Sequence, residues 1–174
     1  YMGFGDGFNA RRSADNFTRE SFAKAVRYCH IRGCKVYVTL NTLVGDREMD
    51  AAAALAQQAS DAGADAILVQ DLGLARVLRA ALPDIPLHAS TQMSIHNLAG
   101  VEAAAEMGIT RAVLARELSL EQIRFISQHA SIETEVFVHG ALCFCYSGQC
   151  YMSALIGRRS GNRGACAQPC RMQY

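Results

Sequence analysis

Several patterns that would assign a protein to a class at once are missing from this chain of 174 residues. It contains no run of about 18 apolar residues, so no membrane-spanning helix is expected. Its opening residues do not form the basic and then apolar segments of a secretory signal. The net charge is only +1, which gives no overall positive field for nucleic acid, although a local patch is still compatible with it.

Three short motifs with known chemistry are missing as well. Gly3, Gly5 and Gly7 do not have the spacing of the dinucleotide-binding fingerprint G-x-G-x-x-G. The chain has neither the H-E-x-x-H pair of zinc proteases nor the C-x₂-C pair of a zinc ribbon. The sequence therefore carries no signature of these three kinds of site.

What is present is the composition and rhythm of an α/β protein. Apolar residues make up 51% of the chain and charged residues 19%, as in a globular domain with a proper core. We predict strands at residues 35–40, 66–69, 87–90, 111–114 and 135–138, and the end of an earlier strand at residues 1–5. Five helices are predicted between them. Their expected N-terminal residues include Thr18, Asp46, Asp71, Asn97 and Ser119.

The repetition of these units favours a barrel. Strands recur roughly every 20–30 residues, each followed by a helix, and the helices end at similar glycines, Gly33, Gly63 and Gly108. This pattern predicts a (β/α)₈ barrel of the TIM type rather than an open sheet, here incomplete with about six strands. We expect further elements outside residues 1–174. We assign residues 1–140 to the partial barrel and 141–174 to a Cys-rich, Gly- and Arg-rich segment at its mouth, in the same domain.

Polar residues follow the predicted strands, at the end of a barrel where active sites lie. The predicted catalytic residues are Asn41, Gln92, Arg116, Glu117 and His139. The predicted substrate-binding residues are Arg11, Arg12, Gln70, Ser90 and Arg163, because amides and hydroxyls orient ligands and arginine matches phosphate oxygens.

Several polar residues that follow the predicted strands also have a purely structural interpretation. Asp71 is better explained as a helix cap than as a catalytic acid, and Arg116 with Glu117 could be a plain ion pair. His88 alternates with apolar neighbours, as a core histidine does. The glycine-rich stretch around Arg163 is either a solvated loop or an anion-binding loop for RNA phosphates.

Five of the seven cysteines lie within the last 32 residues. An odd number of cysteines bunched at one end fits a cytoplasmic metal or redox site better than a secreted disulfide framework. Thiolate ligation of iron suits the spacing best, and zinc is the alternative. The predicted metal ligands are Cys143, Cys150, Cys166 and Cys170. Cys29 and Cys34 are predicted to be core residues.

Three C-terminal stretches closely resemble the U32 family of collagenase-like peptidases. They are residues 135–143 (EVFVHGALC), 146–153 (YSGQCYMS) and 161–171 (GNRGACAQPCR). Five upstream stretches are also similar to that family: residues 8–12 (FNARR), 38–42 (VTLNT), 69–73 (VQDLG), 88–93 (HASTQM) and 114–119 (LARELS). The resemblance covers essentially the whole chain.

The resemblance implies chemistry that differs from the family's historical description as proteases. It implies a [4Fe–4S] cluster and oxygen-independent hydroxylation of a 23S rRNA cytidine or a tRNA wobble uridine, or a role in ubiquinone synthesis. Prephenate is implied as the oxygen donor of the RNA branches, and residues 8–11 and 160–164 look most like the ribosomal RNA branch. Cys143, Cys150 and Cys166 match ligand positions. Cys170 is a substitute for a fourth ligand that usually lies further along the chain, and Cys145 departs from the family's pattern.

Three hypotheses follow. The first is an iron–sulfur RNA hydroxylase that has RNA as its partner. The second is a peptidase in which Cys143 or Cys150 is the nucleophile and His139 its base. The third is a zinc-stapled, non-enzymatic module that binds RNA or ribosomes.

Overall fold

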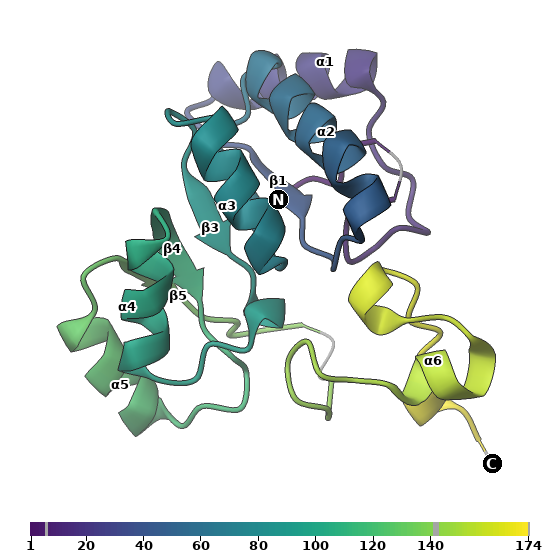
Figure 1. The fold of residues 1–174 in the computed structure, drawn as a ribbon, viewed down its shortest axis with the longest axis vertical. Coiled ribbons are helices and arrows are strands. Elements are labelled where there is room, and N and C mark those ends of the chain that lie inside the picture. The colour runs from purple at the N-terminus through teal and green to yellow at the C-terminus, as the bar shows by residue number, and fades with distance from the viewer. Residues whose placement is uncertain (6, 141–142, 174) are drawn as a thin grey trace.

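The computed structural model describes residues 1–5, 7–140 and 143–173, and its centre is a five-stranded sheet (Figure 1). The strands are β1 (Tyr37–Leu40), β2 (Ala66–Val69), β3 (Leu87–Ala89), β4 (Ile109–Val113) and β5 (Glu133–Glu135). They lie in chain order, and every neighbouring pair is parallel. Unbroken sequential order is the topology of a (β/α) barrel, so the predicted α/β class and the incomplete barrel are confirmed.

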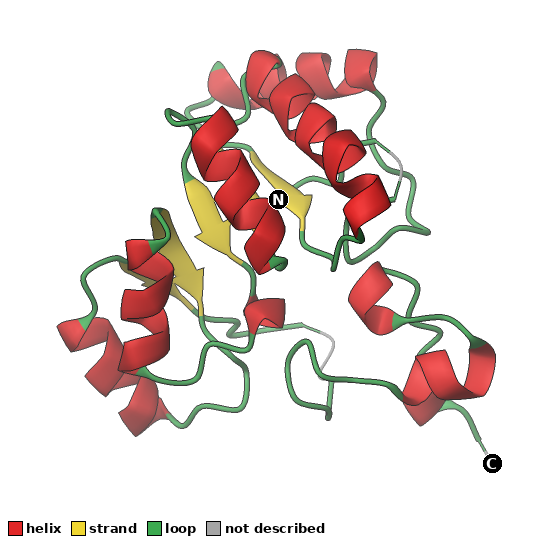
Figure 2. Ribbon diagram, in the orientation of Figure 1, coloured by secondary structure: helices red, strands yellow, loops and turns green. Residues whose placement is uncertain are grey.

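Five helices alternate with these strands and pack along the sheet (Figure 2). They are α1 (Arg19–His30), α2 (Met49–Asp61), α3 (Leu72–Ala81), α4 (Leu98–Glu106) and α5 (Leu120–His129). Thr18 and Ser119 form capping boxes at α1 and α5, as their positions predict. The predicted cap at Asp46 is wrong. Residues Asp46–Glu48 form a separate 3₁₀ turn, η1, and α2 begins only at Met49.

Asp71 is a helix cap that also holds the preceding loop. Its Oδ1 accepts the Leu74 N–H at 2.9 Å, and its Oδ2 accepts the Val44 N–H at 3.2 Å. Asp71→Ala should therefore lower the free energy of unfolding by about 1–2 kcal/mol. Asp46→Ala is the matched control and should change it by less than about 0.5 kcal/mol. Urea unfolding of both variants checks this, and equal losses would show that Asp71 does not act as a cap.

The two faces of the sheet differ in chemistry. Val38, Leu40, Ile67 and Val69 are fully buried on the face that α2 and α3 cover. Alternation along a strand sends the intervening residues to the opposite face, which is the barrel interior. Cross-strand pairing puts four polar or charged residues in one row there, together with one leucine. That row is Thr39, Leu68, His88, Arg111 and Glu133.

Charge pairing in this interior row explains why the last predicted strand is misplaced. The strand occupies Glu133–Glu135, not residues 135–138, and Val138 is exposed. Arg111 on β4 forms ion pairs with Glu133 at 2.7 Å and with Glu135 at 3.3 Å. These contacts hold Glu133–Glu135 against β4, which an apolar pattern alone does not reveal.

The predicted strand at residues 1–5 is present only as two isolated bridges. Met2 pairs with Val38 beside β1, whereas Phe4 pairs with Phe17. The sheet that is described therefore has five strands, one fewer than predicted. Among the described residues, no helix is long and apolar enough to cross a membrane.

The C-terminal segment lies beyond the carboxyl ends of the strands (Figure 2). It contains a short helix, α6 (Met152–Gly157), and the 3₁₀ turns η3 (Gly161–Arg163) and η4 (Pro169–Arg171). Its contacts with the barrel include two backbone hydrogen bonds. The Arg12 N–H donates to the Gly164 carbonyl at 3.2 Å, and the Leu43 N–H donates to the Asn162 carbonyl at 3.0 Å. The predicted boundary between residues 140 and 141 adjoins residues outside the described part.

Candidate functional site

A cavity of about 350 Å³ lies between the strand ends and the C-terminal segment. All five clustered thiols line it: Cys143, Cys145, Cys150, Cys166 and Cys170. Thr91, Gln92 and Arg116 reach it from the ends of β3 and β4, and Arg11 reaches it from the N-terminal loop. Residues separated by more than a hundred positions thus share one cavity, and its lining is the candidate functional site.

The thiols of the cavity differ in their neighbours. Burial raises the pKa of the Cys145 thiol. A hydrogen bond with Cys150 and the negative charges of Cys150 and Cys143 raise it further. Cys166 has a different neighbour, because its Sγ accepts the Gln168 N–H at 3.4 Å. All seven cysteines of the chain are free thiols. The prediction for Cys34 is wrong, since this thiol is exposed, whereas Cys29 is half-buried and packs against the core.

The donor set suits an iron–sulfur cluster better than one zinc ion. Zinc binds thiolates at about 2.3 Å, so four sulfurs around it stand roughly 3.8 Å apart. Within residues 1–5, 7–140 and 143–173, no three His, Cys, Asp or Glu side chains are close enough to hold one ion. A cluster is larger, and its thiolate ligands surround a wider space. Five thiols around one cavity fit that requirement.

Arg116 fastens the cysteine loop to the end of β4. Its Nε–H donates to Ser147 Oγ at 3.0 Å. Its two terminal nitrogens donate to the carbonyls of Cys143 at 3.2 Å and Cys145 at 3.3 Å. A planar guanidinium with several donors can hold three acceptors at once, so Arg116 fixes the backbone that carries two thiols.

Glu117 completes this clamp. It accepts the Ser147 N–H at 2.6 Å and the Ser147 hydroxyl at 3.0 Å. Burial works to raise the pKa of Glu117, but hydrogen bonds from its own N–H and from Ser147, with the charge of Arg116, hold the pKa below its usual range. The two side chains approach each other only to 4.0 Å. Both side chains therefore bind the cysteine loop more closely than they bind each other, and they are not a plain ion pair.

A network of predicted residues lies at the strand ends around Gln92, which lines the cavity. Asn41 accepts the Ala10 N–H at 3.0 Å and donates to Ser90 Oγ at 3.2 Å. The Gln92 amide donates to the Asn41 carbonyl at 3.2 Å. Gln70 directly follows β2 and is buried, and its Oε1 has no partner in the part of the chain that the structure describes. The strand ends thus gather the amides and hydroxyl as predicted, while their roles stay predictions.

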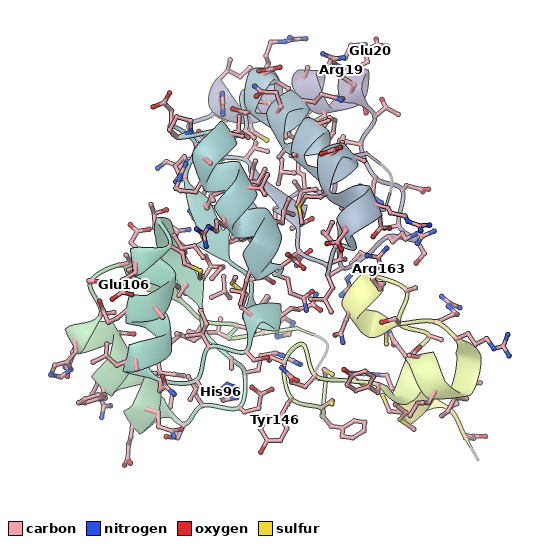
Figure 3. All side chains as sticks on the ribbon, viewed as in Figure 1. Arg19, Glu20, His96, Glu106, Tyr146 and Arg163 are labelled. Carbon is pink, nitrogen blue, oxygen red and sulfur yellow. The ribbon has the colours of Figure 1, made fainter. Side chains whose placement is uncertain are left out.

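The remaining predicted residues are placed differently. Arg163 lies on the C-terminal segment (Figure 3). It forms an ion pair with Glu48, with Nη1 2.8 Å from Oε2, and does not line the cavity. Arg11 lines the cavity, whereas Arg12 stands beside it with its backbone bound to Gly164. His139 is exposed, and in the described ranges no hydrogen bond joins it to a cysteine. His139 is also absent from the lining of the cavity.

His88 occupies the barrel interior. It is only 4% exposed, its ring lies edge-on to Tyr37 at 4.9 Å, and Nδ1 lacks a hydrogen-bond partner among the described atoms. Burial, assisted by the charge of Arg111, lowers the pKa of His88 to about 4. This is the buried core histidine that the sequence pattern indicates.

The buried His88 should make folding stability depend on pH. Between pH 6.5 and about 4 the unfolded chain binds this proton and the folded chain does not, so acidification lowers the free energy of unfolding. The loss over this interval is on the order of 3 kcal/mol. His88→Phe keeps the contact with Tyr37 and should lose correspondingly less on acidification. Denaturant unfolding at pH 7 and pH 4 checks this, and parallel losses for both proteins would contradict it.

Three functional positions escaped the sequence analysis. Ser147 is fully buried and receives both clamp residues, and Gly148 lies against the Gln92 backbone. His96 approaches Glu117 at 3.3 Å, and its ring lies 6.0 Å from that of Tyr146 (Figure 3). The one available signal was that Ser147 and Gly148 sit between the cysteines, where a buried turn needs a small hydroxyl residue and a glycine.

Two curated proteins are similar to this chain in sequence. The 23S rRNA 5-hydroxycytidine C2501 synthase of Escherichia coli (strain K12) is 45% identical over 174 residues, 100% of this chain and 26% of that protein. The tRNA hydroxylation protein P1 of Bacillus subtilis (strain 168) is 38% identical over 170 residues, 98% of this chain and 40% of that protein. The chain thus spans about a quarter to two-fifths of the length of these relatives.

The fold is shared with a solved structure as well. The U32 peptidase Mk0906 superposes with a TM-score of 0.58 at 21% identity, over 72% of this chain and 53% of that one. The sequence profile of Peptidase family U32 matches residues 1–174. With that match over its whole length, and with the predicted cysteine motifs around one cavity, the chain belongs to peptidase family U32.

Proposed function

We propose that this chain is part of an enzyme that hydroxylates RNA without molecular oxygen, using a [4Fe–4S] cluster held at the barrel mouth. The observation that carries the proposal is the convergence of all five clustered thiols on one cavity that Gln92 and Arg116 also line. Curated relatives at 45% and 38% identity are named for hydroxylation of 23S rRNA and of tRNA. The 23S rRNA cytidine is the preferred target and a tRNA uridine the alternative.

The ligands would be Cys143, Cys150 and Cys166, with Cys170 as the fourth candidate. A bound cluster supplies electrons or polarises the oxygen donor. The donor must carry the oxygen atom and accept electrons from the C–H bond that becomes C–OH, and prephenate is our candidate for it. Arg11 would meet its carboxylate or the RNA phosphate, since a guanidinium binds either anion.

The residues of the chain would prepare this site rather than react themselves. Arg116 and Glu117 would position the loop that bears Cys143 and Cys145, through the contacts described above. Asn41, Gln92 and Ser90 would orient the substrate base with amides and a hydroxyl, which can match base edges. Gln70 adds a buried acceptor oxygen to the same network, and among the described residues this oxygen has no hydrogen-bond partner.

The peptidase alternative requires a thiol and its base in contact. Here His139 is exposed and does not line the thiol cavity, so the geometry does not favour a Cys–His pair. The zinc-module alternative requires thiols spaced for one ion, which the arrangement lacks over the described residues. Neither alternative has a specific contact that supports it.

The test is the iron and acid-labile sulfide content of the full-length protein purified without oxygen, together with RNA mass spectrometry. About four iron and four sulfide per chain are expected, with loss of one hydroxylated nucleoside when the gene is deleted. Absence of iron under conditions that load a control protein, with unchanged RNA, would overturn the proposal. Peptide cleavage that survives chelation and stops on one Cys→Ala change would favour the peptidase instead.

A further inference from the structure

The C-terminal segment differs from the rest of the chain in charge. Of the 17 Lys and Arg residues, four lie after residue 140, where there is no Asp or Glu. The first 140 residues hold the other 13, against all 16 Asp and Glu. A chain with almost no net charge is therefore divided into an acidic barrel and a basic segment. Such a local basic patch is the electrostatic footprint of a polyanion site.

The same segment exposes aromatic rings. Phe144 is 75% exposed, Tyr146 is 64% exposed and Tyr151 is 67% exposed, all within eight residues. Burying these rings would be favourable, so three together on the surface mark a binding site rather than a packing accident. Tyr146 lines the thiol cavity, and Phe144 and Tyr151 each adjoin a cysteine that lines it. Tyr146 thus borders the cavity, and the other two rings lie on the same thiol-bearing chain segment.

Two arginines supply positive charge, one at the cavity and one on the C-terminal segment. Arg11 lines the same cavity, and within the described part of the chain no acceptor contacts its guanidinium. Arg158 is exposed just after α6. Arg163 is already held by Glu48 and is left out of this surface. Exposed rings interspersed with unpaired arginines suit a partner that offers both flat apolar faces and phosphates.

We propose that Phe144, Tyr146 and Tyr151, with Arg11 and Arg158, form a surface that binds unpaired RNA and stacks its bases. The inference rests on the proposed function and specifies its substrate as a single-stranded stretch. Bases in a duplex are stacked on one another and offer no free face, whereas unpaired bases stack on aromatic side chains. A cavity of about 350 Å³ admits one extruded base, with its neighbours held outside on the rings.

The test is fluorescence anisotropy with the full-length protein and two labelled RNAs, an unstructured 12-nucleotide strand and a duplex of the same sequence. The single strand should bind about ten-fold more tightly or better. Tyr146→Ala and Tyr151→Ala should each weaken that binding by about ten-fold, because stacking contributes about 1–3 kcal/mol per base. Tyr146→Phe keeps the ring and should restore binding.

Tyr28→Ala is the matched control, since Tyr28 is 60% exposed on α1, in the acidic barrel. It should leave RNA affinity unchanged. Equal affinity for strand and duplex would overturn the inference while leaving the proposed function intact, provided that deletion still removes a hydroxylated nucleoside. A fall in melting temperature without a fall in affinity would show that other parts of the polypeptide cover the rings, and would also overturn it. No binding of either RNA, with unchanged cellular RNA, would count against the proposed function itself.

Discussion

Cys150→Ser should remove the iron chromophore and the RNA product together. Cys150 lines the cavity beside Cys145, and it is one of the three thiols that we propose as cluster ligands. A hydroxyl is a poor ligand for iron in such a cluster, which thiolates hold. We expect the absorbance near 400 nm, characteristic of the cluster, to be lost, and the hydroxylated nucleoside to fall at least about 100-fold. Anaerobic spectra and nucleoside mass spectrometry of a complemented deletion strain measure both.

Cys29→Ser supplies the control, because this thiol packs on α1 against the core and does not line the cavity. It should cost on the order of 1–2 kcal/mol of stability and leave the chromophore in place. Cys145→Ser separates the remaining thiols. If Cys145 is a spare, its loss should leave the iron content unchanged. Equal loss of iron in the Cys29 and Cys150 variants would contradict our division of the cysteines.

The repeated glycines and buried strands made the barrel predictable from the sequence. Gly33, Gly63 and Gly108 end helices with positive φ angles of 69°, 93° and 81°, a conformation that glycine adopts without strain. The run at 66–69 is buried at every position, as expected for a strand covered on both faces. Local chemistry fixed both features, so local patterns sufficed to find them.

Elements held by distant partners were not predictable in the same way. Glu133 and Glu135 form a strand because Arg111 pairs with both, and the sequence does not show that partner. Arg163 resembles a phosphate-binding residue until Glu48, more than a hundred positions away, takes its guanidinium. Charged side chains are assigned to function or to structure only when their partners are known, which sequence spacing alone does not give.

The thiol cavity was predictable in its ligand types but not in its support. Cysteine clustering identified the segment whose thiols line the cavity, and strand ends identified Arg116, which also lines it, and the neighbouring Glu117. The clamp through Ser147 depends on a turn folding back over the strand ends. No periodicity marks such a turn, so the role of Ser147 emerges only from the folded chain.

Gly148→Ala should detach the cysteine loop while leaving the barrel folded. A Cβ at this position would lie 2.0 Å from the Gln92 carbonyl oxygen, and the backbone has φ of +71°. The obstacle is backbone, so no side chain can swing away, and a left-handed alanine adds about 1–3 kcal/mol of strain. Because Ser147 is the next residue back, displacement of Gly148 also pulls the turn from Arg116 and Glu117. We expect faster thiol labelling at Cys145 and Cys150, with an unchanged far-ultraviolet circular dichroism spectrum.

Gly157→Ala is the matched control in the same segment. Nothing lies within 4 Å of a Cβ built there, and the residue is the last of α6, where alanine is a better helix former. Its thiols should label at the wild-type rate. Gly164→Ala, whose Cβ would lie 2.0 Å from the Asn9 carbonyl oxygen, should act like Gly148→Ala and speed thiol labelling. Labelling of the thiols at the wild-type rate in both Gly148→Ala and Gly164→Ala would contradict this expectation. That result would show that the loop does not depend on the close backbone contacts of the two glycines, and that the contacts of Arg116 and Glu117 alone position the thiols.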